Sequence, residues 1–136
     1  MFRSRLLTAA SALFLSALPA LSLTLECKVP QSNAGGGYIT ELYILQYDEA
    51  AGQAIVSDGL IMYYNDEQPM KAKVSEDTAK KLVLTWNVQM TNSTGQMTKM
   101  QFRASYFKAD KTVTIRAVPG GGYANDFEGR GKCKSI

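Results

Sequence analysis

The strongest pattern in the chain is a strict alternation of apolar and polar residues in its second half. Between residues 82 and 90 every second side chain is large and apolar, and most of the intervening ones are polar. The apolar set is Leu82, Leu84, Trp86, Val88 and Met90. Because successive side chains of a β-strand point to opposite faces, a period of two predicts a strand with one buried face. Segments 70–75, 99–106 and 112–117 repeat the pattern.

The first half of the chain also predicts strands, with turn chemistry between them. Leu23–Val29 alternates, and Tyr38–Tyr47 is rich in the aromatic and β-branched residues that strands favour. A short strand at Ala54–Ser57 is followed by an Asp-Gly pair, Asp58-Gly59, that predicts a tight reversal. Leu60–Tyr64 would then form the next strand.

About eight strands with short connections predict an antiparallel meander in which neighbours in sequence pair in space. A sheet with one apolar face must close on itself or pack on a second sheet. We therefore expect an all-β fold, a small antiparallel up-and-down barrel of about eight strands. A two-sheet β-sandwich is the alternative.

The two cysteines, Cys27 and Cys133, lie near the two ends of the predicted domain. A metal site would need further ligands, and the chain has no histidine and no CxxC motif. We therefore predict a disulfide, which also favours barrel closure over a sandwich. Closing a loop of roughly 100 residues stabilises a fold by about 4–5 kcal/mol on the chain-entropy model.

Residues 1–22 have the three parts of a cleavable signal peptide. Arg3 and Arg5 give a basic start, Leu6–Leu18 is a short apolar run, and Ala20 and Ser22 provide small residues at the cleavage site. The apolar run is too short for a transmembrane helix, which needs roughly 20 residues. The pattern predicts a periplasmic or secreted single β domain at 23–136, without stable membrane insertion after cleavage.

Removing the signal peptide changes the charge picture. The whole chain has 15 Lys and Arg residues against 12 Asp and Glu, and two of the arginines lie in the signal peptide. The remaining 13 basic residues nearly balance the 12 acidic ones, so we expect no nucleic acid partner.

The absence of histidine removes the commonest general base, the usual metal ligand and the usual partner of a nucleophile. Paired carboxylates leave a carboxylate enzyme as a minor alternative. The adjacent pairs are Asp48/Glu49, Asp66/Glu67 and Glu76/Asp77, each in a predicted turn where acidic residues suit solvent. We expect no enzyme, no cofactor and no metal.

Tyrosine and glycine positions give the candidate binding surface, because tyrosine offers a large contact area with a polar tip. Two of the candidates follow glycine runs and one lies between Gly129 and Gly131. The candidates are Tyr38, Tyr63, Tyr64, Tyr123 and Arg130. Glycine within a strand often marks a close approach, and here we expect the pair at 129 and 131 to make room for Trp86 or Phe127.

These observations favour an exported, noncatalytic β-barrel binding module that recognises a protein or another cell-envelope component. The alternative is a carrier that holds a small apolar ligand inside the barrel. Eight strands allow either a filled interior or one small ligand. The sequence predicts neither the identity of the partner nor the oligomeric state.

Overall fold

The computed structural model describes residues 22–91, 93–120 and 125–136, which contain eight strands, one short α-helix and one 3₁₀ turn. In chain order they are β1 (Ser22–Lys28), η1 (Asn33–Gly35), β2 (Leu42–Asp48), β3 (Gln53–Ser57), α1 (Gly59–Tyr64), β4 (Met70–Asp77), β5 (Lys81–Thr91), β6 (Met97–Phe107), β7 (Thr112–Pro119) and β8 (Phe127–Ser135). The predicted signal peptide, except for Ser22, lies outside the described residues.

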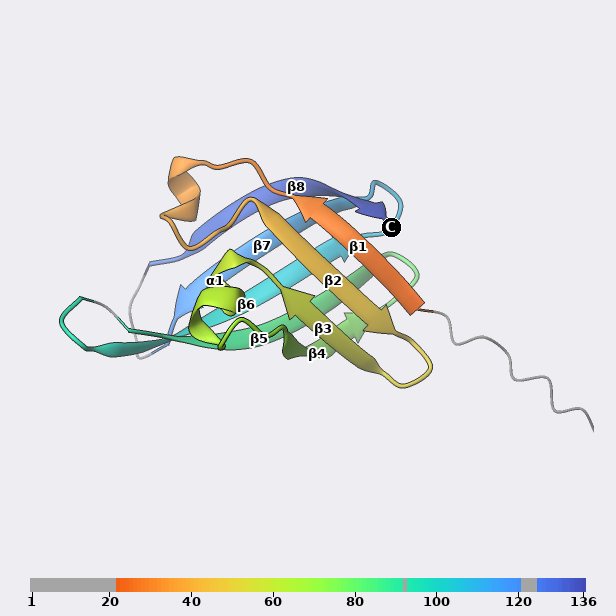
Figure 1. Cartoon of the computed structure of the whole chain (residues 1–136). Coiled ribbons are helices and arrows are strands. Elements are labelled where there is room, and N and C mark those ends of the chain that lie inside the picture. Colours follow the sequence, from red (N-terminus) through yellow and green to blue (C-terminus); the bar gives the residue numbers. More distant parts are fainter. Residues whose placement is uncertain (1–21, 92, 121–124) are drawn as a thin grey trace, which may run out of the picture.

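The strands form a closed antiparallel barrel in simple chain order, β1 to β8, so the predicted up-and-down barrel is confirmed (Figure 1). β8 returns to pair with β1, and this pairing places Cys27 directly opposite Cys133. The two residues form the predicted disulfide. The bridge therefore joins the first and last strands where the barrel closes.

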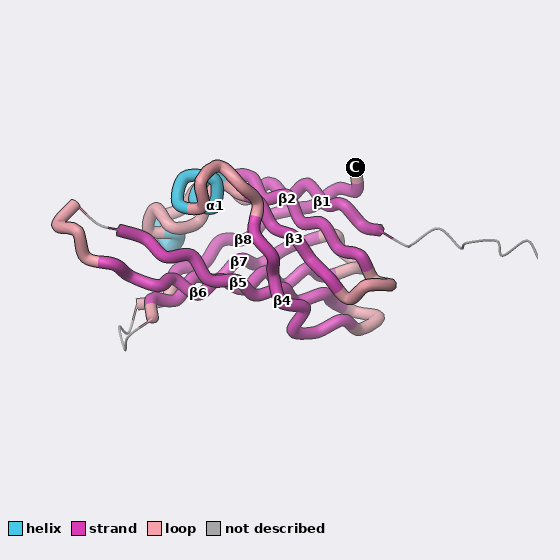
Figure 2. Tube along the Cα trace, turned by 60° about the horizontal axis from the view of Figure 1, so that its bottom comes forward, coloured by secondary structure: helices cyan, strands magenta, loops and turns pink. Residues whose placement is uncertain are grey.

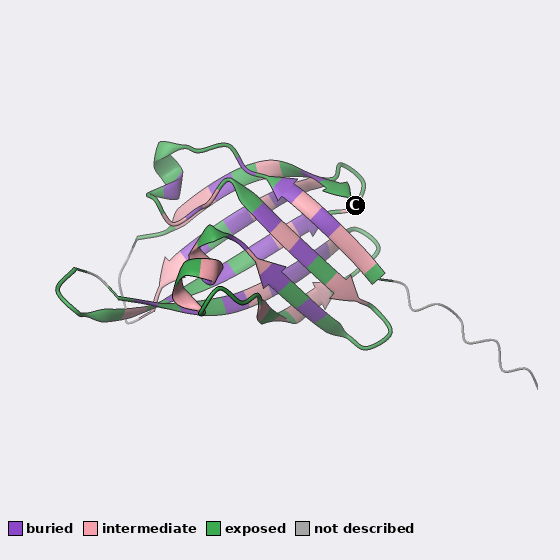
Figure 3. Cartoon of the chain, in the orientation of Figure 1, coloured by how far each residue is buried: buried purple, intermediate pink, exposed green. Residues whose placement is uncertain are grey.

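Burial follows the alternation that the sequence predicts, with buried and exposed positions succeeding each other along the strands (Figure 3). Trp86 and Phe102 are directly opposite on β5 and β6, and their rings stack with centroids 5.6 Å apart. The Tyr43 ring packs 6.4 Å from the Trp86 ring. Met90 and Met100 are buried in the same core. Large side chains thus occupy the interior.

Two predicted elements were wrong in detail. Leu60–Tyr64 belongs to α1 and does not form a strand, because Asp58 caps a helix there instead of starting a tight reversal. β2 begins at Leu42 rather than Tyr38, because Ile39 leaves the sheet to join the core.

The two ends of the barrel differ (Figures 1 and 2). One end, here called the loop end, carries the connections that follow β1, β3, β5 and β7, of which the first two are long, at 29–41 and 58–69. The other, here called the turn end, carries the short connections 49–52, 78–80 and 108–111.

The connection 29–41 folds back over β8, and two glycines make this approach feasible. A Cβ on Gly131 would lie 2.0 Å from the Lys28 carbonyl oxygen, and one on Gly129 would lie within 2.8 Å of both Val29 and Ile39. The glycines therefore make room for the end of β1 and for the β1–β2 connection, not for Trp86 or Phe127 as expected. Val29 and Ile39 are buried in the core as a result.

Candidate functional site

Helix α1 at the loop end begins at a buried carboxylate, that of Asp58. The Asp58 side chain accepts a hydrogen bond from the backbone N–H of Ile61 at 2.8 Å, as an N-cap does. Ile61 itself is fully buried, and Leu60 and Tyr64 pack against the core. A helix of six residues is too short to be stable alone, so the cap and this packing define it.

Asp58 is only 6% exposed and belongs to a small polar network beneath the helix. The Thr40 hydroxyl donates to its second oxygen at 2.7 Å, and the Thr40 N–H donates to the Tyr43 hydroxyl at 3.0 Å. Burial raises the pKa of Asp58, and burial also raises the pKa of Tyr43 to about 12. The network joins the two long connections of the loop end to each other.

The capped helix presents tyrosine to solvent. The Tyr63 side chain is 78% exposed, and its ring meets the ring of Tyr64 edge to face at a centroid distance of 4.8 Å. Tyr64 is half-buried, so it supports Tyr63 while packing on the core. Met97, the first residue of β6, adds a second large exposed side chain at the same end.

The other candidate residues do not join the Tyr63–Tyr64 pair in the part of the chain that the structure describes. The Tyr38 ring packs on Phe127 at 4.6 Å, so most of its surface is used within the fold. Tyr123 lies outside the described residues. Arg130 is exposed on the outer face of β8 and its guanidinium contacts Glu128 at 3.2 Å. Of the four candidates that the structure describes, it brings Tyr63 and Tyr64 together.

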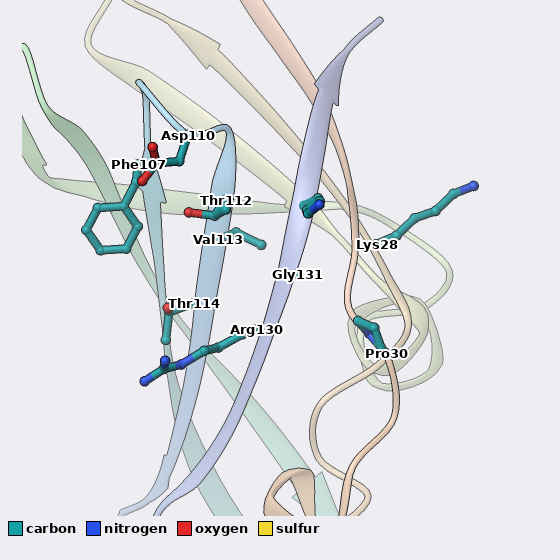
Figure 4. Close-up of a pocket in the computed structure, with 10 residues that line it drawn as sticks. Lys28, Pro30, Phe107, Asp110, Thr112, Val113, Thr114, Arg130 and Gly131 are labelled. Atoms are coloured by element: carbon teal, nitrogen blue, oxygen red, sulfur yellow. The ribbon is translucent and has the colours of Figure 1, made fainter.

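Arg130 belongs to a groove of about 740 Å³ on the outer wall of the barrel (Figure 4). Phe107 and Arg130 extend to one side of β8, and Lys28 extends to the other. Lys132, opposite Lys28 in the ladder, is the third basic residue of a lining that also holds Asp110 and neutral or apolar residues.

Of the adjacent carboxylate pairs, Glu76 and Asp77 are held by separate contacts. Glu76 and Asp77 belong to β4 rather than to the predicted turn, and they bind different partners: Glu76 contacts Lys81 at 3.3 Å. Asp77 accepts from Tyr47 at 2.6 Å and from Lys108 at 2.7 Å. Among the residues the structure describes, no three acidic, histidine or cysteine side chains are grouped to hold a metal ion.

Sequence reasoning missed Met97 and the helix that presents Tyr63. The signal for the helix was present: an N-capping residue at Asp58 precedes Leu60, Ile61 and Tyr64, which share one face of a helix. The signal for Met97 was its position: residues 100, 102, 104 and 106 face inward, so extending their alternation puts residue 97 on the outward face.

Comparisons with protein-family models, with curated proteins and with solved structures find no match to this chain. Within the described part of the chain, no helix has the length and apolar character needed to cross a membrane.

Proposed function

We propose that this protein is an exported, noncatalytic binding module that recognises a protein or another cell-envelope component through the loop end of its barrel. The observation that carries the proposal is the asymmetry of the two ends. A rigid barrel holds two long connections at one end, and a strongly exposed tyrosine projects from one of them. Binding residues concentrate on loops that a rigid scaffold positions.

The geometry around Tyr63 supports this assignment. An exposed tyrosine supplies a large contact area at a low cost in conformational entropy. Tyr64 and the buried Ile61 fix the helix from which Tyr63 projects. Since the surface is ordered before a partner arrives, little further ordering is needed on binding.

The disulfide and the signal-like start support an exported location. Disulfides persist in oxidising compartments such as the periplasm and the extracellular space. Cys27 and Cys133 are bridged, and neither is free. Together with the basic and apolar pattern of residues 1–22, the bridge favours a periplasmic or secreted protein.

The alternative, a carrier with an apolar ligand inside the barrel, has less support. The positions that would line such a cavity hold large side chains that contact one another, among them the stacked Trp86 and Phe102. A ligand would have to displace these contacts, which are worth about 0.5–1.5 kcal/mol per aromatic pair beyond area burial.

Site-specific photocrosslinking tests the proposal. A benzoylphenylalanine is placed at position 63, and in a matched protein at position 50, where Ala50 is exposed in the β2–β3 turn at the turn end. Each full-length oxidised protein is irradiated in envelope extract of the source cells. We expect a discrete adduct at position 63 and none at position 50.

Competition by unlabelled protein tests whether Tyr63 itself contributes to the binding surface. An excess of unmodified protein should abolish the adduct, whereas an excess of the Tyr63→Ala variant should compete at least about tenfold less well, as for a central aromatic contact. Equal labelling at positions 50 and 63, or equal competition by the variant, would overturn the proposal.

A further inference from the structure

The outer wall formed by β6, β7, β8 and β1 carries cations in like-charged rungs. Arg103 on β6 lies directly opposite Arg116 on β7, and Lys28 on β1 lies directly opposite Lys132 on β8. All four side chains are exposed on the outside of the barrel. Such cross-strand neighbours have Cβ atoms about 5 Å apart, and like charges in this position are destabilising.

Neutralisation of this wall within the protein is incomplete. Arg116 pairs with Asp126, and Arg130 pairs with Glu128. For the other three cations, Lys28, Arg103 and Lys132, the described residues provide no ion-pair partner. The Arg103/Arg116 rung therefore keeps one uncompensated charge, on Arg103. The Lys28/Lys132 rung keeps two.

The same wall is hollowed in two places. The groove of about 740 Å³ combines Lys28, Arg130 and Lys132 with the apolar surfaces of Pro30 and Phe107. A second depression of about 530 Å³ is lined by Arg103 and Arg116, together with Val118 and Gln101. Each depression thus offers cations beside an apolar contact and a neutral polar group.

We propose that this basic wall, defined by Lys28, Arg103, Arg116, Arg130 and Lys132, binds an acidic peptide segment of a partner protein. Arginine forks match carboxylates, and carboxylates over the two rungs would relieve the like-charge repulsion. An apolar side chain between the acidic residues would lie against Phe107. The two rungs are offset by about four residues, roughly 13 Å along the strands, and β6 and β1 are three interstrand spacings of about 4.8 Å apart, so a short extended segment running diagonally across the wall covers the patch.

The wall fits a peptide better than a nucleic acid or a lipid surface. Asp110, Asp126 and Glu128 lie among the cations and would repel a dense row of phosphates. DNA carries one charge per about 1.7 Å of its axis, whereas a peptide can space its carboxylates to avoid these acids. A flat lipid surface would touch the convex wall of a barrel along a narrow strip only.

This inference does not rest on the proposed function, because the basic wall and the loop-end tyrosine are different surfaces. Tyr63 belongs to none of the residues that line the two depressions. If the peptide does not bind the basic wall, the crosslinking result at position 63 is unaffected. If crosslinking at position 63 fails, the peptide-binding result is equally unaffected.

The test measures binding of a fluorescein-labelled peptide, Glu-Leu-Glu-Gly-Asp-Phe-Glu, by fluorescence anisotropy in 20 mM salt. The wall variant is Arg103→Gln with Lys132→Gln, and the matched control is Lys71→Gln with Lys73→Gln. The control lysines are exposed on β4 and their removal changes the net charge equally. We expect the wall variant to bind about fivefold more weakly and the control to change by less than about twofold.

Two further readouts separate binding from folding and from general charge. The wall variant should melt no lower than the parent, because it removes one member of each like-charged rung. Inorganic phosphate, phosphatidylglycerol vesicles and a single-stranded oligonucleotide, each at matched charge, should bind more weakly than the peptide. Equal losses in both variants, no peptide binding at all, or tighter binding of any of these three probes would overturn the proposal.

Discussion

The two ends of the barrel are held by different kinds of interaction. At the loop end, the connections are fastened by buried contacts: Val29 and Ile39 join the core, and Asp58 caps α1 beneath the surface. At the turn end, Tyr47, Asp77 and Lys108 form a polar tie between neighbouring turns on the exterior. Long connections here are therefore parts of the core, whereas short ones are linked by surface polar contacts.

This difference means that, in the proposed binding module, α1 and the 29–41 connection are held in place by buried contacts. Buried contacts fix the loop end strongly, since each fully buried aliphatic side chain contributes about 1.5–3 kcal/mol. Exposed ion pairs contribute about 0–1 kcal/mol each. Substitutions of the buried residues that hold the loop end should therefore lower the free energy of unfolding far more than substitutions of the exposed polar residues at the turn end.

The largest effect is expected from removing the disulfide. Replacing both cysteines, Cys27→Ser with Cys133→Ser, should lower the free energy of unfolding by about 4–5 kcal/mol, because the closed loop spans 106 residues. Urea denaturation monitored by Trp86 fluorescence measures this. Reductant should reproduce the loss in the parent protein and leave the variant unchanged. A loss below about 1 kcal/mol would show that the bridge is not what holds β1 to β8.

The next largest effect tests the close approach of β8 to the end of β1 and to the start of the β1–β2 connection. Gly131→Ala should cost about 3 kcal/mol, because the new Cβ would lie 2.0 Å from the Lys28 carbonyl oxygen and backbone would have to move. Thermal unfolding of the oxidised variant provides the measurement.

Gly59→Ala is the matched control for that substitution. Its Cβ would meet only the Thr40 methyl group at 3.8 Å, an ordinary contact, and alanine favours a helix by up to about 1 kcal/mol. The control should therefore be equally or more stable than the parent. If both variants lost the same stability, close packing at Gly131 would not explain the fold of the loop end.

The sequence predicted the fold best where tertiary contacts reinforce the local pattern. On β5 and β6 the alternation of Trp86, Phe102 and their neighbours agreed with burial, except that Val83 on the opposite face of β5 is buried as well. The barrel closure and the disulfide followed from hairpin spacing and from the positions of Cys27 and Cys133. Both features depend on spacings and positions that can be read directly from one sequence.

Prediction failed where a distant residue decides a local conformation. Segment 38–41 has strand composition, but Ile39 packs over Gly129 and Thr40 donates to Asp58, so the segment leaves the sheet. The Asp58-Gly59 pair resembles a hairpin turn, yet burial of Ile61 makes it the start of a helix. The exposure of Tyr63 depends on that helix. Because the burial of Ile61 could not be foreseen, the sequence analysis placed Tyr63 in a strand.

A smaller effect is expected at the buried cap. Asp58→Ala should cost about 2 kcal/mol, because it removes the N-cap and leaves the Ile61 N–H and the Thr40 hydroxyl without their acceptor. Asp58→Asn keeps an acceptor for the helix and should cost less than half as much. Urea denaturation at pH 7 compares the two.

The pH dependence of stability distinguishes the parent from Asp58→Asn. Because burial raises the pKa of Asp58 above its unfolded value, the folded state binds the additional proton first, and this group adds stability as pH falls through that interval. The parent should show this contribution and Asp58→Asn should lack it. Identical pH profiles of parent and variant between pH 7 and pH 4 would contradict a raised pKa.

The smallest effect is expected at the turn end. Asp77→Asn should cost at most about 1 kcal/mol at pH 7, because its ion pair with Lys108 is partly exposed and screened by solvent. Lys108 lowers the pKa of Asp77, so the stabilisation is present above the unfolded value near 4 and is lost as pH falls through the folded value. Urea midpoints of parent and variant should therefore differ at pH 7 and converge near pH 2. Glu76→Gln, which loses only the more exposed contact with Lys81, should change the midpoint less. A cost at Asp77 equal to that of Asp58→Ala would mean that the turn end is fastened as firmly as the loop end, and the contrast between the two ends would fail.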